Sequence, residues 1–178
     1  MTNILVTGAG GGGGNNMIQC VRRLFKSDLK IIGTNCSENH IAMSTSDETF
    51  MENVFTKHNP DILFHASAYK HVTLCEENII KCIQNNFIAT TQLLKTSLKY
   101  DLEEFVFIST DKAVNSTNMM GCSKRLSEIY IKNYLYDNGF KTNFSIVRFG
   151  NVIGSAGSVS ELFREQINNN GPLTLTHP

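Results

Sequence analysis

The sequence Phe-Val-Phe-Ile-Ser-Thr-Asp-Lys, residues 105–112, runs from four apolar residues directly into four polar ones. The apolar half is a continuous run of β-favouring residues, which is typical of a strand buried on both faces of a parallel sheet. Ligands of open α/β sheets bind outside the carboxyl ends of the strands. The polar half, which includes Thr110, Asp111 and Lys112, therefore lies where chemistry is expected.

A helix is predicted to follow this segment, from about Gly121 to Asn138, with Gly139 as a typical residue to end it. Met120 and Lys124 stand four residues apart where this helix begins. On a helix that spacing puts both side chains on one face. Both residues are therefore candidate companions of the polar segment.

The composition excludes several classes of protein. The chain has 178 residues, with 41% hydrophobic and 18% charged, which is typical of an ordinary globular protein. The formal net charge is zero, so no long-range field favours nucleic acid or an anionic membrane. We find no apolar run of the roughly 20 residues that a membrane helix needs. The five cysteines form no Cys-x-x-Cys pair, so we expect reduced thiols and no metal site. Because the chain opens on a strand pattern rather than a signal peptide, we expect a cytoplasmic protein.

A glycine-rich turn stands between a predicted strand over residues 3–7 and a predicted amphipathic helix over residues 16–26. Strand, glycine turn and helix together are the context of a dinucleotide fingerprint, in which the backbone approaches a pyrophosphate at a helix N-terminus. Two glycine registers fit this fingerprint: Gly8, Gly11 and Gly14, or Gly8, Gly10 and Gly13. We expect phosphate binding here; the alternative is a merely flexible loop.

Small residues end the strand predicted over residues 61–68. Ala66, Ser67 and Ala68 would let a flat cofactor lie against the backbone, although they would equally suit tight packing of a helix on the strand. We expect His65, just before them, to be a hydrogen-bonded core residue rather than a ligand. The strand predicted over residues 29–33 is followed by neither an acid nor an arginine at the expected ribose position, so the choice between NAD and NADP stays open.

The remaining pattern alternates strands with helices and indicates a single α/β fold. Such alternation predicts a doubly wound parallel sheet of the Rossmann type. We expect a dinucleotide-binding domain over residues 1–150 and the beginning of a substrate-binding lobe over residues 151–178. The other predicted elements are a helix over 47–58 capped by Asp47, a long helix over 79–99, a strand over 144–148 and a helix over 159–167.

Four stretches together resemble the extended short-chain dehydrogenase/reductase group, and within it the UDP-N-acetylglucosamine 4,6-dehydratases of bacterial surface polysaccharide biosynthesis. These stretches lie between about Pro60 and Pro178. They are Pro-Asp-Ile-Leu-Phe-His-Ala-Ser-Ala-Tyr-Lys-His-Val (60–72), Ser-Thr-Asp-Lys-Ala-Val-Asn (109–115), Asn-Met-Met-Gly-Cys-Ser-Lys-Arg (118–125) and Val-Arg-Phe-Gly-Asn-Val-Ile-Gly-Ser (147–155).

The resemblance implies a specific reaction. A bound NAD or NADP takes hydride from C4 of a UDP-sugar, the C5 proton is removed, the C6 hydroxyl leaves as water, and the hydride returns to C6. Family roles carry over to Thr110, Asp111 and Lys112, with Asp111 as the acid and Lys112 as the C5 base. Because adjacent strand residues point to opposite faces, the backbone must leave the strand near Thr110 for both to act. The resemblance also implies a homo-oligomer.

The resemblance assigns further residues to binding. Lys124 matches the lysine that holds the cofactor ribose, and Asn86 matches an asparagine on the preceding helix. Lys70, His71 and Asn151 fall on the substrate side.

Three departures from the family pattern leave alternatives open. Most short-chain dehydrogenases have tyrosine where this chain has Met120, and a thioether cannot move a proton, so deprotonation of the C4 hydroxyl would fall to Thr110, Asp111 or water. Residues 35–61 are too few for the family's second crossover helix and third strand, and the sugar-binding lobe is incomplete. A non-catalytic dinucleotide-binding remnant is therefore the alternative to an enzyme. The glycine-rich beginning and Ile-Gly-Thr-Asn at 32–35 also resemble the leading domain of ATP-grasp ligases, but the downstream stretches argue against that for the whole chain.

Overall fold

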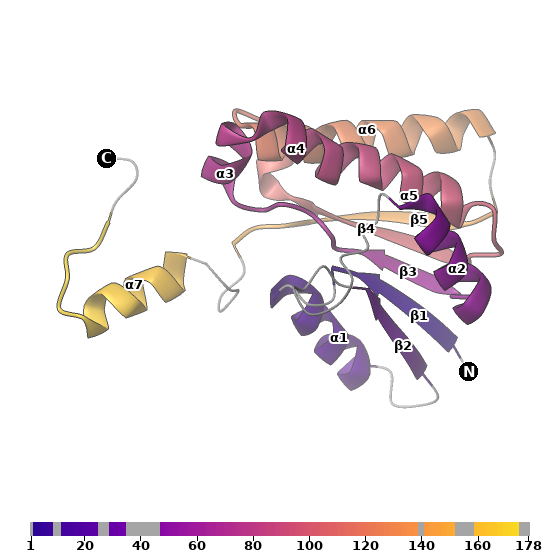
Figure 1. The fold of residues 1–178 in the computed structure, drawn as a ribbon, viewed down its shortest axis with the longest axis horizontal. Helices are drawn as coiled ribbons and strands as arrows, with labels where there is room; N and C mark the ends of the chain where they lie inside the picture. The colour runs from indigo at the N-terminus through magenta and orange to yellow at the C-terminus, as the bar shows by residue number, and fades with distance from the viewer. Residues whose placement is uncertain are drawn as a thin grey trace.

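A five-stranded parallel sheet in the order β2-β1-β3-β4-β5 organises the protein (Figure 1). The computed structural model describes residues 2–8, 12–24, 29–34, 47–138, 141–151 and 159–174. The order reverses between β1 and β3, which is the switch point at which ligands bind in such sheets. The strands are β1 (Thr2–Thr7), β2 (Leu29–Thr34), β3 (Ile62–His65), β4 (Glu104–Thr110) and β5 (Asn143–Phe149).

Helices cover both faces of the sheet, which confirms the predicted doubly wound α/β fold (Figure 1). On one face α1 packs against β1, while α2, α5 and α6 cover the other face. Among the described residues, no helix combines the length and the apolar character that a membrane crossing requires. The helical segments are α1 (Gly12–Leu24), α2 (Glu48–His58), α3 (Val72–Glu77), α4 (Ile79–Ile83), the π-helix η1 (Gln84–Ile88), α5 (Ala89–Ser97), the 3-10 turn η2 (Asp111–Ala113), α6 (Met119–Asn138) and α7 (Val159–Asn168).

The strict alternation of strand side chains divides the apolar residues into two cores. Leu5, Leu63 and Phe105 point toward α2, α5 and α6 and form the larger core with residues such as Phe55 of α2. Ile4 and Val6 point to the opposite face and pack with Val21 of α1. The central strands are therefore apolar on both faces, as the continuous run at the start of residues 105–112 predicted.

Several predicted boundaries were wrong, and each has a local cause. Helix α1 begins at Gly12, inside the glycine run, rather than at residue 16. Helix α6 begins at Met119, because the Asn118 side chain accepts from Gly121 N at 2.8 Å and caps the helix early. The single helix predicted over 79–99 contains the π-helical segment η1 and ends at Ser97. Strand β3 ends at His65, so residues 66–68 belong to the following loop.

One predicted helix cap is confirmed, and one predicted domain boundary stays untested. Asp47 caps α2 as expected, since its carboxylate accepts from Phe50 N at 3.0 Å. Helix α7 lies apart from the sheet (Figure 1), and the division of the chain at residues 150 and 151 stays a prediction. Residues 9–11, 35–46 and 152–158 lie outside the described part of the chain, and with them the predicted phosphate contact of Gly11 and one glycine of each register.

Replacing Asp47 with alanine tests the cap. The Asp47→Ala variant leaves a helix N–H without its partner, so the free energy of unfolding should fall by about 1 kcal/mol. Urea denaturation measures this change. Asp101→Ala, at an exposed turn aspartate, serves as the control and should change stability by less than about 0.5 kcal/mol. Equal losses in the two variants would contradict the capping role.

Candidate active site

The carboxyl end of β4 turns sharply into η2 at Thr110. The Thr110 hydroxyl accepts from Lys112 N at 3.3 Å and donates to Asp111 Oδ1 at 3.0 Å. This hydroxyl therefore caps the turn at the point where the extended backbone ends. The 3-10 turn interrupts the alternation of the strand, so that consecutive side chains no longer point to opposite faces.

As a result, the side chains of Asp111 and Lys112 meet. Lys112 Nζ lies 3.1 Å from Asp111 Oδ1 and donates to Asn151 Oδ1 at 3.2 Å. Hydrogen bonds from Lys112 and from Thr110 hold the pKa of Asp111 below its usual range. The Lys112 side chain is 36% exposed and the Asp111 side chain 55% exposed. The structure thus brings together an acid, an amine and an amide that the sequence separates by up to 40 residues, with their polar ends open to solvent.

Helix α6 fixes this turn from behind through Gly121. A Cβ atom at Gly121 would clash with the carbonyl oxygen of Lys112 and lie 2.9 Å from its carbonyl carbon. Only a residue without a side chain lets the helix approach the η2 backbone so closely. The first turn of α6 therefore determines where the backbone of Asp111 and Lys112 lies.

Met120 and Lys124 share a face of α6 as predicted, and both are buried. Met120 packs with Cys75 and Cys82. Lys124 Nζ donates to the carbonyl of Ile108 at 2.8 Å and lies 4.5 Å from the centre of the Phe107 ring. Burial lowers the pKa of Lys124 to about 8. The ammonium thus supports the backbone of β4 two residues before Thr110.

Asn86 is fully buried in the π-helical segment η1. Its side-chain amide accepts from Tyr69 N at 2.7 Å and donates to Tyr69 O at 3.0 Å. One residue therefore clamps both polar groups of a single residue in the loop after β3. Lys70 and His71, which follow immediately, are exposed on this loop. Asn86 positions the loop that carries two of the predicted substrate-side residues.

The turn after β1 lies directly against the end of β3. Gly8 has φ +74°, and a Cβ atom there would lie 2.8 Å from Ser67 Cα and 3.0 Å from the Ala66 carbonyl carbon. Glycine is therefore required both for the backbone angle and for the close approach. Ala66 and Ser67 take part through their backbone, while Ala68 continues the same loop. Gly14 lies within the first turn of α1, whereas residues 9–11 of the glycine run lie outside the described part of the chain.

His65 is a core residue, as predicted. Its Nδ1 lies 2.7 Å from Thr7 Oγ1 and its Nε2 lies 2.8 Å from Thr90 Oγ1. Because the Thr90 hydroxyl donates its proton to Asn86 O, Nε2 must donate to Thr90 and Nδ1 must accept from Thr7. Burial, together with the charge of Lys124, lowers the pKa of His65 to about 3, so the ring is neutral.

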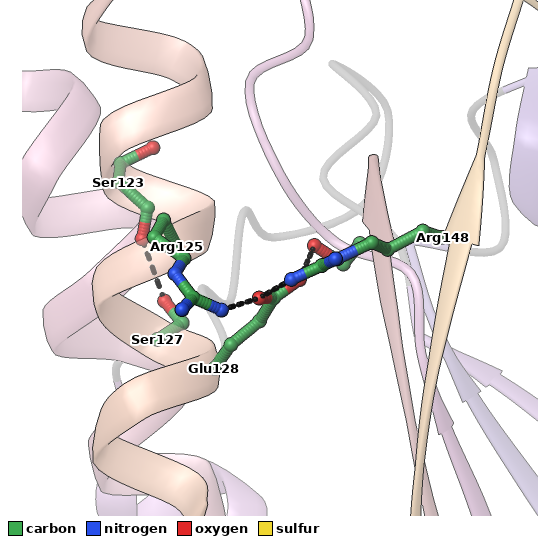
Figure 2. A network of polar contacts seen from close by, with 6 residues as sticks. Ser123, Arg125, Ser127, Glu128 and Arg148 are labelled. Atoms are coloured by element: carbon green, nitrogen blue, oxygen red, sulfur yellow. Dashed lines mark hydrogen bonds and ion pairs between the residues drawn. The ribbon is translucent and has the colours of Figure 1, made fainter. Parts of the chain in front are cut away.

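A buried carboxylate beside this site escaped the sequence analysis. Glu128 of α6 is buried between Arg148 of β5 and Arg125 of its own helix (Figure 2). Ser109 Oγ donates to Glu128 Oε1 at 2.6 Å and Arg148 Nε donates to it at 2.8 Å. The signal was available: Met120, Lys124 and Glu128 follow at four-residue spacing, so Glu128 falls on the face that was already expected to carry Met120 and Lys124.

Comparison with known proteins identifies the family. Residues 34–178 match the model of the family described as "Polysaccharide biosynthesis protein". The chain belongs to this family.

Members and neighbours of the polysaccharide biosynthesis family resemble the chain over most of its length. The capsular polysaccharide biosynthesis protein CapD of Staphylococcus aureus is 37% identical, over 98% of this chain and 32% of CapD. The UDP-N-acetylglucosamine 4,6-dehydratase (inverting) of Campylobacter jejuni is 29% identical, over 93% of this chain and 53% of the enzyme. The solved UDP-glucose 4-epimerase of Thermotoga maritima superposes with a TM-score of 0.80 at 24% identity, covering 96% of this chain and 64% of the epimerase. The chain thus spans between about a third and two thirds of the length of these proteins.

Replacing Gly121 with alanine tests whether the close approach of α6 fixes the η2 turn. In an ordinary helix, glycine to alanine raises stability by about 1 kcal/mol. Because the Lys112 carbonyl occupies the space, Gly121→Ala should instead lower the free energy of unfolding by about 1–3 kcal/mol, the cost of overpacking. Denaturant unfolding measures the sign.

Gly171→Ala is the matched control, because its Cβ would meet only Gln166 O at an ordinary 3.5 Å. A stabilised Gly121→Ala variant would show that the approach of α6 to η2 is looser than described.

Proposed function

We propose that the chain carries the cofactor-binding and acid–base part of an NAD(P)-dependent nucleotide-sugar 4,6-dehydratase, with UDP-N-acetylglucosamine as substrate and a 4-keto-6-deoxy sugar as product. The observation that carries the proposal is the contact of Asp111 with Lys112 at the carboxyl end of β4. The activity for which the Campylobacter jejuni relative is named supports the choice of reaction. A cytoplasmic location and a homo-oligomeric state are further predictions of the same proposal.

The residues at the switch point fit a dinucleotide cofactor. Gly8 brings the turn after β1 against the backbone of Ser67, which leaves no side chain between the two strand ends. Helix α1 begins at Gly12, so its free N–H groups follow directly after this turn. Lys124 supports the backbone of β4, and Asn86 holds the loop after β3. Through these two elements both residues would position the ribose of the cofactor. When bound, NAD or NADP supplies the hydride acceptor and donor for the sugar.

Asp111 and Lys112 would act on neighbouring carbons of the hexose. Lys112 takes the C5 proton, and Asp111 donates a proton to the departing C6 hydroxyl. Asn151 Oδ1 holds the Lys112 ammonium from the β5 side at 3.2 Å, which orients the amine. The acid and the base must reach adjacent carbons at once, and a single 3-10 turn between consecutive residues meets that requirement.

The charge states require one proton to move before the reaction. Lys112 donates to the carboxylate of Asp111, whereas a base must be a free amine and an acid must carry a proton. Transfer of one proton across the 3.1 Å contact turns the ion pair into that neutral acid and amine. Removal of water disfavours charged forms, so a sugar that covers the half-exposed pair would promote the transfer.

Met120 changes the assignment of the first step. Its thioether is buried with Cys75 and Cys82 and carries no transferable proton. The hydroxyl of Thr110, which lies on the same turn as Asp111, is the group that could accept a hydrogen bond from the C4 hydroxyl. Because Asp111 already carries the proton from Lys112, we assign the relay of the C4 proton to Thr110 and water.

A non-catalytic, dinucleotide-binding remnant is the second candidate function. It is favoured by Met120, because the buried thioether cannot move a proton where most short-chain dehydrogenases have a tyrosine. In that case the cofactor would bind without any change in a UDP-sugar. A 4-epimerase, like the Thermotoga maritima neighbour, would yield a sugar that keeps its C6 oxygen.

Incubation of the chain with UDP-N-acetylglucosamine and either NAD⁺ or NADP⁺ in heavy water tests the proposal. We expect deuterium at C5 and loss of the C6 oxygen in the product. Mass spectrometry and NMR measure both changes. Lys112→Ala should abolish both, because it removes the C5 base. Lys57→Ala, at an exposed lysine of α2, is the control and should keep both.

Two outcomes would contradict the dehydratase, and a third would contradict the role of Lys112. Cofactor binding in calorimetry with no sugar product would establish the remnant. A 4-epimer with no deuterium at C5 would establish the epimerase. Full exchange and elimination in Lys112→Ala would exclude Lys112 as the base.

A further inference from the structure

The buried Glu128 carboxylate joins two neighbouring strands from a single helix position. Ser109 of β4 and Arg148 of β5 face each other in the register of the sheet, and both donate to Glu128. Arg125 adds a third donor from the preceding turn of α6. Figure 2 shows Glu128 reaching from α6 toward the Arg148 side chain, with Arg125 on the helix side of the carboxylate.

The Glu128 carboxylate is charged, and both of its oxygen atoms accept hydrogen bonds. Its side chain is 2% exposed. Although burial raises the pKa of Glu128, hydrogen bonds from Arg148, Ser109 and Arg125 outweigh it and lower the pKa to about 2. A buried charge of this kind is a poor source of net stability compared with apolar packing, because removal from water is costly. Its value is geometric: a two-oxygen acceptor meets an arginine fork in only a narrow range of positions.

The network lies one residue behind the proposed reaction centre. Thr110 and Phe149 form the next register pair after Ser109 and Arg148. Beyond that pair, β4 continues into Asp111 and Lys112, and β5 continues into Gly150 and Asn151. The side-chain contact between Lys112 and Asn151 at 3.2 Å therefore joins the two strand ends a few residues beyond the position that Glu128 ties together.

We propose that Glu128 is a positioning residue, which holds the ends of β4 and β5 in the alignment that places Lys112 against Asn151 and Asp111. This inference rests on the proposed function, since the alignment matters to the dehydratase reaction. It assigns to Ser109, Arg125 and Arg148 the role of fixing the carboxylate. Glu128 itself touches no reacting atom in this account.

Two readouts on the Glu128→Gln variant test the proposal at neutral pH. The first is turnover of UDP-N-acetylglucosamine per folded molecule, which should fall by about 10- to 100-fold with little change in KM, because a small misplacement of catalytic groups costs this much. The second is competitive acetylation by acetic anhydride, in which the ratio of Lys112 to Lys57 modification should rise severalfold as Lys112 is released from its partners. The second readout requires no enzyme activity.

Val54→Ala is the matched control, because it opens a cavity in the core beside α2 and lowers stability far from this network. It should leave both readouts at their wild-type values once the folded fraction is taken into account. If Glu128→Gln does not fold, Ser109→Ala keeps the carboxylate with both arginines and should shift both readouts in the same direction by a smaller amount.

The proposal is overturned if Glu128→Gln, or Ser109→Ala in its place, matches Val54→Ala in the acetylation ratio. Absence of turnover in the wild-type chain would instead reject the proposed function, and the acetylation ratio would still decide whether Glu128 positions Lys112.

Discussion

The approach of α6 to the turn after β4 is the constraint on which the rest of the site depends. Gly121 admits the Lys112 carbonyl into space that any side chain would fill, and Asn118 caps the helix so that it begins at that point. The strand can therefore stop at Thr110 and turn at once. Without this contact, Asp111 and Lys112 would follow the alternation of an extended strand and point to opposite faces.

The buried face of α6 carries polar side chains near the site and an apolar side chain farther along the helix. Lys124 supports the Ile108 carbonyl, Ser127 donates to the Asn86 carbonyl, and Glu128 joins Ser109 to Arg148. Each of these buried polar groups is thus satisfied by a partner on another element. Farther along, Ile131 lies in the main hydrophobic core. One helix therefore anchors the core at one end and organises the strand ends at the other.

The architecture was predictable from the sequence because each signal was local. The apolar run before Ser109 indicated a two-sided strand, and the glycine run after Thr7 indicated a tight turn. Asp47 indicated a helix start. The polar segment after β4 was also predicted as a candidate site, because ligands of open α/β sheets bind outside the carboxyl ends of the strands.

The contacts within the site were harder to predict from the sequence, because they join residues that are distant in the chain. Nothing in the local pattern indicates that Asn86 clamps the Tyr69 backbone, since this depends on an extra residue in the π-helical turn. Glu128 was missed because a charged helix residue is ordinarily solvent-exposed, and only its donors on two strands make its burial possible. The meeting of Lys112 with Asn151 depends on the register of β4 and β5, which the sequence does not specify.

The central claim is that one turn divides the acid and the base between two consecutive residues. The most direct measurement is the ratio of C5 hydrogen exchange to water elimination in Asp111→Asn, followed in heavy water with UDP-N-acetylglucosamine. The account predicts that elimination falls by about 100-fold or more, since a general acid contributes at least that much, whereas C5 exchange falls less, because Lys112 can still lose its proton to water. Equal loss of both steps, or an unchanged ratio, would contradict it.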